Sequence, residues 1–479
     1  MRSLNMQALA APLAAAALLA GCGSLVPRTE APVPPLRSDF RAGAPAPAVD
    51  TAAADAAVRE WAGFINDPRL REVVGIALTQ NRSLRASAAA VERVQAQYRI
   101  QRAAGAPQLG VSAAATRQRT LENGAATSYS LSLGLAAWEI DLFDRLGSLE
   151  GAALARYLAQ TETQQSARLS LVAETLNAWL NLQALQQHAV LAQQLLQSQQ
   201  RTLDLAEAQY QRGASSGLDR ARARTAFEAA RGEAARSAVA VQQARAQLEL
   251  LAGQPLPDAL LPDALLPDAL LPAAQETPGR GDATALPAIP AGLPAEVLLQ
   301  RPDVRAAEQA LQASAFDVGA ARAALFPRLT LTASAGTRSA ELGGLFGRGS
   351  GVWSVVPQLD LALFDAGARR AQVDASEASR REALARYEAT LQTAFREVAD
   401  ALAVRDGLAE RLSAQQAQVD AAQRSLGLVE QGYRLGANSQ LDLLDAQRQL
   451  ASAQQGLVDL RQAERANRVD LLRALGGRW

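Results

Sequence analysis

The sequence predicts a mostly α-helical chain that carries membrane β-strands and contains an internal duplication. Ala, Leu, Gln, Arg and Glu dominate the 479 residues and aromatic residues make up only 4%, a composition typical of long helices. Several short motifs recur about 220 residues later in the same order. Between the helical stretches, short segments alternate apolar with small polar residues, which is the period of a β-strand.

The charge balance and the scarcity of Cys and His exclude several function classes. The 48 basic residues are matched by 48 acidic ones, so no excess charge is available to neutralise the phosphates of a nucleic acid. Every basic residue is Arg, which excludes Lys-dependent P-loop and Schiff-base chemistry. One His and one Cys cannot build a Cys/His zinc site, and a nucleophile–His–acid set would have to use His188. We therefore expect no enzyme, metal or cofactor, and we expect His188 on a solvated or packing face.

The N-terminus predicts export and lipidation. An apolar run over residues 8–19 is too short for a membrane span and is typical of a signal peptide, residues 1–21. Leu-Ala-Gly-Cys, ending at Cys22, resembles the bacterial lipobox, which implies a covalent lipid on that sulfur and cleavage before it. Gly23 stands where an Asp would suggest retention at the inner membrane, so the resemblance favours the outer membrane. The alternative is a free Cys in a leader.

Residues 22–65 read as the acylated Cys followed by an extended tether, because this stretch is rich in Pro and Ala. The body then consists of a first structural repeat, residues 66–253, and a second, residues 297–479. The offset between matching motifs stays between 220 and 223. The matched segments are 81–86 with 301–306, 107–109 with 327–329, 142–144 with 363–365, 210–214 with 433–437, and Gly253 with Gly476.

Each repeat predicts a helix, two strands, a long helix, a tight turn and a last helix. The first helix of repeat one is expected over residues 67–104, where Pro107 follows its end. The long helices are expected over 146–212 and 367–434, since both stretches lack Pro and nearly lack Gly. Their apolar stripes are wide enough to meet neighbours on two sides, whereas a dimeric coiled coil needs one narrow seam.

The predicted strands carry the signature of a membrane barrel. In repeat one, Leu109, Val111 and Ala113 alternate with small polar residues, and the stretch from Tyr129 to Leu135 does the same. In repeat two the strands are expected from Leu329 and over 353–363, each near the ~9–11 residues of a tilted membrane strand. A soluble hairpin with one apolar face is the alternative. Aromatic residues at the strand ends fit an interfacial girdle: Trp138, Phe143, Phe326, Phe346, Trp353 and Phe364.

Residues 254–296 form a Pro-rich linker with a tandem pentapeptide. Leu-Pro-Asp-Ala-Leu starts at Leu256, Leu261 and Leu266, and a fourth copy begins at Leu271-Pro272. We interpret the array as an expanded spacer, and a specific role for the pentapeptide is the less favoured alternative.

Four strands in one chain cannot close a barrel, and open sheet edges are not tolerated in lipid, whereas three chains would supply twelve strands. This plan, with the segments 290–294, 301–308 and 443–447, resembles the TolC family of outer-membrane efflux factors, and the lipobox points to its lipoprotein branch. The resemblance covers about residues 60–477. It implies a homotrimer with a 12-stranded β-barrel in outer-membrane lipid, continuous with a long periplasmic α-helical barrel.

The family implies an outer-membrane channel of a tripartite efflux pump, a passive exit duct for drugs or other small toxic compounds. Its implied partners are a periplasmic adaptor protein and an inner-membrane transporter of the resistance–nodulation–division type. A lipid-anchored periplasmic coiled-coil scaffold or adaptor without a pore is the alternative, although it leaves the two amphipathic hairpins unexplained.

By motif match, the resemblance places Leu441, Asp442, Asp445 and Arg448 at a periplasmic gate. Asp442 and Asp445 share a helix face, so threefold symmetry would stack two carboxylate rings; a solvated charged face is the alternative. We hypothesise that one or more of three arginines lock the gate by pairing with these carboxylates: Arg220, Arg222 and Arg224. The expected adaptor docking tips are the two turns, represented by Gly213, Ala214, Ser215, Gly436, Ala437 and Asn438.

Overall fold

A computed structural model describes residues 24–27, 65–120, 124–263 and 295–477. These residues belong to two compact units. Unit 1 contains residues 89–163 and 303–390 together with the segment before residue 35, and unit 2 contains residues 35–88, 164–302 and 391–479. Cys22, the predicted signal peptide and most of the predicted tether lie outside the described residues.

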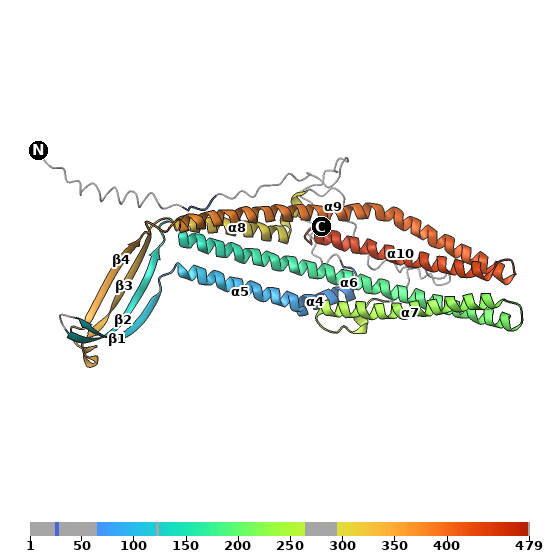
Figure 1. Ribbon diagram of the computed structural model, residues 1–479, viewed down its shortest axis with the longest axis horizontal. Coiled ribbons are helices and arrows are strands. Elements are labelled where there is room, and N and C mark those ends of the chain that lie inside the picture. The colour runs from blue at the N-terminus through green and yellow to red at the C-terminus, as the bar shows by residue number, and fades with distance from the viewer. Residues whose placement is uncertain (1–23, 28–64, 121–123, 264–294, 478–479) are drawn as a thin grey trace. The chain divides into compact units, whose positions relative to one another are not determined.

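The element order repeats, as the duplication predicts (Figure 1). The two long helices, α6 and α9, each contain 67 residues and lie very near their predicted bounds. The first repeat contains α4 (Pro68–Gln80), α5 (Arg82–Ala104), β1 (Leu109–Thr120), β2 (Gly124–Ile140), α6 (Arg145–Gln211) and α7 (Gly217–Ala252). The second contains α8 (Pro302–Ala323), β3 (Arg328–Ser339), β4 (Gly351–Asp360), α9 (Ala368–Arg434) and α10 (Gln440–Ala474).

The first predicted helix is two helices, so the expectation of one helix over 67–104 is wrong. Asn81 interrupts it with extended backbone angles, φ −60° and ψ 126°. Its side-chain oxygen accepts a hydrogen bond from the N–H of Leu84 at 2.9 Å, which caps the start of α5. An Asn that satisfies the next helix start in this way competes with continuation of the helix. Strand β4 also ends earlier than predicted, at Asp360.

The four strands form one antiparallel sheet in unit 1, in the order β1-β2-β3-β4 (Figure 1). The register places Leu109 opposite Leu135, Leu135 opposite Ala333 and Ala333 opposite Val355, so these residues share one face. A register shift between Leu135 and Trp138 marks a bulge. Strands β1 and β4 are the two edges of the sheet.

The two faces of the sheet differ in chemistry. The face that carries Leu109 also carries Val111, Leu133, Trp353 and Leu359, whose side chains are more than half exposed in the single chain. The opposite face carries mostly Ser, Thr and Gly. Two pairs of serines on that face bond across neighbouring strands, Ser112 with Ser132 at 2.8 Å and Ser334 with Ser354 at 2.9 Å.

The rest of unit 1 packs its helices closely. Helix α8 buries Leu311 and Val318 among small residues, whereas α5 contributes no fully buried side chain. Gly151 of α6 faces the ring of Phe316, and a Cβ there would lie 2.7 Å from that ring, so only glycine permits this approach. Arg322 of α8 pairs with Glu377 of α9 at 2.8 Å.

Unit 2 contains an apolar core formed by α4, α7, α10 and the middle of α6. Trp179 and Leu176 of α6, Leu248 of α7 and Leu472 of α10 are at most 2% exposed. Burying side chains of this size stabilises the fold by about 1.5–3 kcal/mol each.

In unit 2, the last helix of each repeat is held near its end by one side-chain hydrogen bond to a backbone carbonyl, and we call these two contacts the joints. The Asn81 amide donates to the carbonyl of Leu251 near the end of α7 at 2.9 Å. The Arg301 guanidinium donates to the carbonyl of Ala474 at the end of α10 at 2.8 Å and pairs with Glu397 at 2.8 Å. Leu251 and Ala474 are equivalent positions of the duplication.

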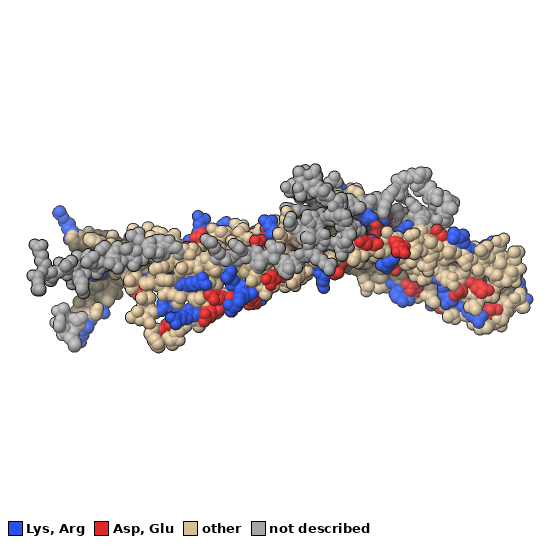
Figure 2. All heavy atoms as spheres, turned by 90° about the horizontal axis from the view of Figure 1, so that it is seen from above, with Lys and Arg blue, Asp and Glu red and all other residues tan. Residues whose placement is uncertain are grey.

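Figure 2 shows arginine and acidic side chains interspersed along the helices of the face in view, so the near-zero net charge reflects local balance. Several of these charges pair within one helix at spacings of three or four residues, such as Arg231 with Glu228 and Arg245 with Glu249. Within the described ranges, no helix combines the length and apolar composition needed to cross a membrane.

Candidate functional site

The candidate site in unit 2 consists of the two turns that join the long helices to the last helices, together with the helix starts that follow. Gly213 and Gly436 adopt left-handed backbone angles, φ 72° and φ 76°. The next amides bond back in the same way: Ala214 donates to Gln209 at 2.9 Å and Ala437 donates to Gly432 at 2.8 Å. The two turns are therefore the same motif, and each requires a residue that tolerates positive φ.

Both last helices begin with a capping box that sequence reasoning missed. The Asp442 amide donates to the Ser439 hydroxyl at 3.2 Å, and the Asp442 carboxylate accepts from the Ser439 N–H at 2.9 Å. Ser216 and Asp219 form the equivalent box at α7. The missed signal is a Ser three residues before an Asp, next to a turn. The Ser439 hydroxyl and then its N–H donate to the charged carboxylate and lower the pKa of Asp442.

The other predicted gate residues lie on the first turns of α10. The Asp445 carboxylate accepts from Arg448 at 2.8 Å and from the Gln449 amide at 2.7 Å. Leu441 is 48% exposed. Asp445, Arg448 and Leu441 are thus accessible in the single chain, and Arg448 already holds one of the two carboxylates.

The three predicted locking arginines lie on α7. Arg220 stacks over the Tyr210 ring, 4.3 Å from its centroid, and Arg222 lies 3.9 Å from Asp219. Among the described residues of this one chain, no ion pair joins Arg220, Arg222 or Arg224 to Asp442 or Asp445. The locking hypothesis, in which these arginines pair with the second-repeat carboxylates across the coiled-coil pair, stays a prediction.

Contacts between the repeats near the turns involve amides that sequence reasoning did not select. The Tyr433 hydroxyl donates to the Gln209 side chain at 3.3 Å. Further along α10, Gln447 is buried and donates to the Ser198 hydroxyl at 3.1 Å, while Gln199 donates to Gln447 at 2.9 Å. The second repeat places Gln447 where the first has Arg224, so this polar contact has no equivalent in the first repeat.

His188 lies on α6 and contacts Asp459 of α10 at 2.7 Å. The contact is a hydrogen bond that joins the two helices. The lipidation residue Cys22 lies outside the described residues and stays a prediction.

Comparison with known proteins adds three findings. The sequence model of the outer membrane efflux protein family matches residues 73–254 and 293–477, one match in each repeat. The antibiotic efflux pump outer membrane protein ArpC of Pseudomonas putida is 38% identical over 472 residues, 96% of this chain and 94% of the relative. The toluene efflux pump outer membrane protein TtgC of Pseudomonas putida has the same identity and coverage.

The solved structure of the open state of the MtrE outer membrane channel of Neisseria gonorrhoeae is also similar. It is 34% identical, with a TM-score of 0.81 over 95% of this chain and 98% of that one. Helix order, strand order and sequence thus agree over nearly the whole length.

Proposed function

This chain belongs to the outer membrane efflux protein family and is an outer-membrane channel of an efflux system, and we propose that three copies of it form the exit duct of a tripartite pump. The observation that carries the trimer is the four-stranded sheet with its two open edges, β1 and β4. Unpaired edges are costly in lipid, and pairing β1 of one copy with β4 of the next closes a barrel of twelve strands.

In this barrel the apolar face of the sheet contacts lipid and the Ser/Thr/Gly face lines the lumen. Trp353 and Leu359 then face the acyl chains, and Ser112 and Ser334 face water. The aromatic rings near the strand ends, including the stacked pair of Phe143 and Phe326 at 4.5 Å, would lie at the membrane interface.

In the proposed trimer, Leu441, Asp442, Asp445 and Arg448 would form the periplasmic gate. Three copies of Asp442 and Asp445 give two carboxylate rings, which favour cations. Arg220, Arg222 or Arg224 would hold the gate shut by pairing with these carboxylates across the coiled-coil pair. The two turns around Gly213 and Gly436 would bind a periplasmic adaptor, which joins the duct to an inner-membrane transporter.

The remaining parts of the proposal concern the lipid anchor, the absence of a reaction and the compounds that pass through the duct. A lipid on Cys22 would anchor each copy in the outer membrane, because each buried methylene group adds about 0.8 kcal/mol. The duct would perform no reaction and need no cofactor. Two relatives are named for antibiotic and toluene efflux, and we propose that this chain also passes drugs or other small toxic compounds.

Conductance in a planar lipid bilayer tests the channel and its gate together. Wild-type protein should give discrete, small conductance steps, and Asp442→Ala with Asp445→Ala should raise them. Asp219→Ala is the matched control, because it removes the equivalent capping carboxylate from α7 without touching the predicted rings. If Asp219→Ala raises the conductance as much as the double variant does, the change results from the loss of helix capping. If the wild-type protein gives no conductance, a lipid-anchored scaffold without a pore is favoured.

A further inference from the structure

The first two copies of the pentapeptide are held by two arginines in the same way. Both copies lie in unit 2, after the end of α7. In each, one guanidinium contacts the backbone carbonyl of the Leu at position one and the carboxylate of the Asp at position three. The two arginines come from different helices, Arg245 from α7 and Arg69 from α4.

Arg245 binds the first copy. Its Nη2 donates to the carbonyl of Leu256 at 3.3 Å, and its Nη1 lies 2.8 Å from the carboxylate of Asp258. Glu249 orients the guanidinium through a contact of 3.1 Å with its Nε and also accepts from the Leu256 N–H at 3.4 Å. The residues that follow Pro257 form a short 3-10 turn, η1 (Asp258–Leu260).

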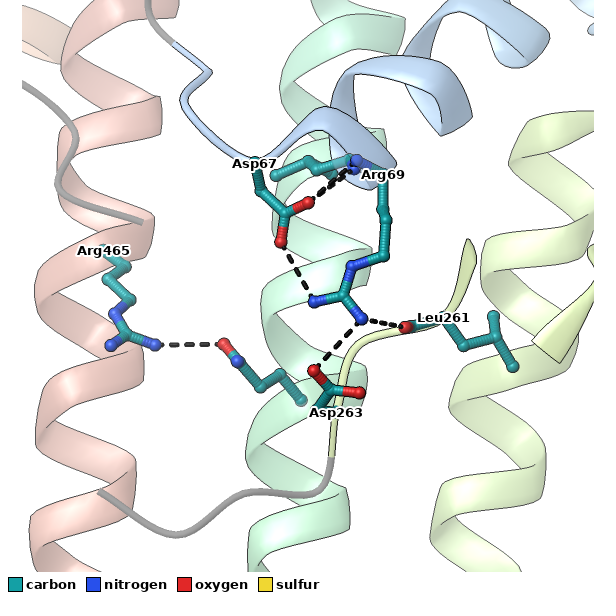
Figure 3. Close-up of polar contacts among 7 residues, drawn as sticks. Asp67, Arg69, Leu261, Asp263 and Arg465 are labelled. Atoms are coloured by element: carbon teal, nitrogen blue, oxygen red, sulfur yellow. Dashed lines mark hydrogen bonds and ion pairs between the residues drawn. The ribbon is translucent and has the colours of Figure 1, made fainter. Parts of the chain in front are cut away.

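Arg69 binds the second copy (Figure 3). Its Nη1 donates to the carbonyl of Leu261 at 3.3 Å and lies 3.1 Å from the carboxylate of Asp263. Asp67, the cap of α4, orients this guanidinium through a contact of 3.3 Å with Nη2. Glu249 and Asp67 thus perform the same task at the two sites.

The leucines of the two copies complete the match. Leu256 is 3% exposed and Leu261 is 8% exposed, and both belong to the core formed by α4, α6, α7 and α10. A step of five residues therefore returns a Leu to the core and an Asp to an arginine. Apolar burial supplies affinity, and the guanidinium contacts with a carbonyl and a carboxylate supply specificity for a Leu-Pro-Asp segment.

We propose that Arg245 and Arg69 are two equivalent binding sites for Leu-Pro-Asp, and that the three copies in the linker compete for them. The sequence provides a third complete copy with the same recognition residues, Leu266-Pro267-Asp268, which lies outside the described residues. The fourth start lacks the carboxylate, because Ala273 stands at its third position. Both sites can then be filled in two registers, by copies one and two or by copies two and three.

A shift from the first register to the second releases copy one into the connection before the two sites and takes copy three from the connection after them. The number of filled sites and the residues that fill them stay the same. Only the lengths of the two flanking connections change, and loop-closure entropy depends weakly on length. The linker between the repeats is therefore an adjustable strap with fixed attachment points.

Hydrogen–deuterium exchange of the full-length protein in detergent tests the proposal. Asp258→Ala weakens the first register and leaves the second intact. We expect residues 256–260 to exchange about two- to fivefold faster, as loss of a surface ion pair allows. Residues 266–270 should exchange more slowly by a similar factor, because the third copy replaces the first.

The double variant Asp258→Ala with Asp268→Ala is the matched control, since it disables the third copy as well. It should keep the faster exchange of residues 256–260 and lose the slower exchange of residues 266–270. In a protein that already carries Arg245→Ala, adding Asp258→Ala should change the exchange of neither segment. The proposal is overturned if Asp258→Ala leaves residues 266–270 unchanged, or if it leaves residues 256–260 unchanged.

Discussion

The two joints of unit 2 perform the same task with different chemistry. In the first repeat a neutral amide, Asn81, bonds to the carbonyl of Leu251, and the chain approaches so closely that a Cβ on Gly253 would lie 2.5 Å from the carbonyl oxygen of Gln80. In the second repeat a guanidinium, Arg301, bonds to the equivalent carbonyl, and a Cβ on Gly476 would meet its nearest atom at 3.4 Å.

The difference shows that a longer side chain can make the same hydrogen bond where the two backbones lie further apart. The short amide works only because the backbones of α4 and α7 approach tightly. The longer guanidinium spans a wider gap, but it then needs Glu397 to balance its buried charge. Substitutions at the two joints break or sharpen this comparison.

The largest effect is expected for Arg301→Ala. It leaves Glu397 without its principal partner and the Ala474 carbonyl without a donor, which should destabilise the fold by about 3 kcal/mol. Thermal unfolding of the trimer in detergent measures the loss. Arg305→Ala is the control, because that side chain is 51% exposed and should cost less than about 0.5 kcal/mol. An equal loss of stability in the two variants would show that the buried contacts of Arg301 stabilise the fold no more than an exposed ion pair does.

The second effect is the difference in unfolding free energy between Gly253→Ala and Gly476→Ala. Both positions have φ 77°, so each substitution carries left-handed strain of about 1–2 kcal/mol. Only Gly253→Ala also drives a methyl group against backbone, which adds about 1–3 kcal/mol. Unfolding temperatures should therefore fall further for Gly253→Ala, and the reverse order would contradict the close approach.

The third effect is that of Asn81→Ala, about 1–2 kcal/mol, because two hydrogen bonds are lost. Asn81→Asp separates them: it keeps an acceptor for the Leu84 N–H and loses the donor to Leu251. If the joint matters more than the cap, Asn81→Asp should unfold at nearly the same temperature as Asn81→Ala. A temperature close to wild type would assign the stability to the cap instead.

The smallest effect concerns pH at the start of α10. The Ser439 hydrogen bonds hold the pKa of Asp442 below its ordinary value of about 3.9, so the capping box is fully formed above that pH and is lost as pH falls through the lowered folded-state pKa. Exchange of residues 440–444, corrected for its intrinsic pH dependence, should speed up only on strong acidification. Asp442→Asn should exchange quickly at all these pH values, and a wild-type response near pH 6 would contradict the assignment.

Much of the fold could be predicted because the repeats preserve their contact points. The motifs that align Asn81 with Arg301 and Gly253 with Gly476 proved to be two sides of the same joints. The long helices were predictable because Pro is absent from them. The break at Asn81 was missed, since its cause is a hydrogen bond to Leu84 that competes with a favourable helical pattern.

The candidate site was only partly predictable. The turns at Gly213 and Gly436 can be recognised from the sequence. The Ser439–Asp442 capping box could also have been recognised from its three-residue spacing. The contact of Asp445 with Arg448 depends in addition on the side-chain conformation that Arg448 adopts. The sequence predicted only a spacer for the linker, because a repeated pentapeptide does not indicate which residues of the fold bind it. Arg69 and Arg245 lie 176 positions apart, and only folding shows that they recognise the same three residues.

The paired serines of the sheet have a consequence for traffic through the proposed lumen. Ser112 with Ser132 and Ser334 with Ser354 satisfy each other across strands, so each pair presents fewer free hydrogen-bonding groups than two separate hydroxyls would. Such a wall is wetted by water yet adheres weakly to a solute. A solute that passes these two pairs in the proposed lumen would therefore meet fewer free hydrogen-bonding groups than at four separate hydroxyls.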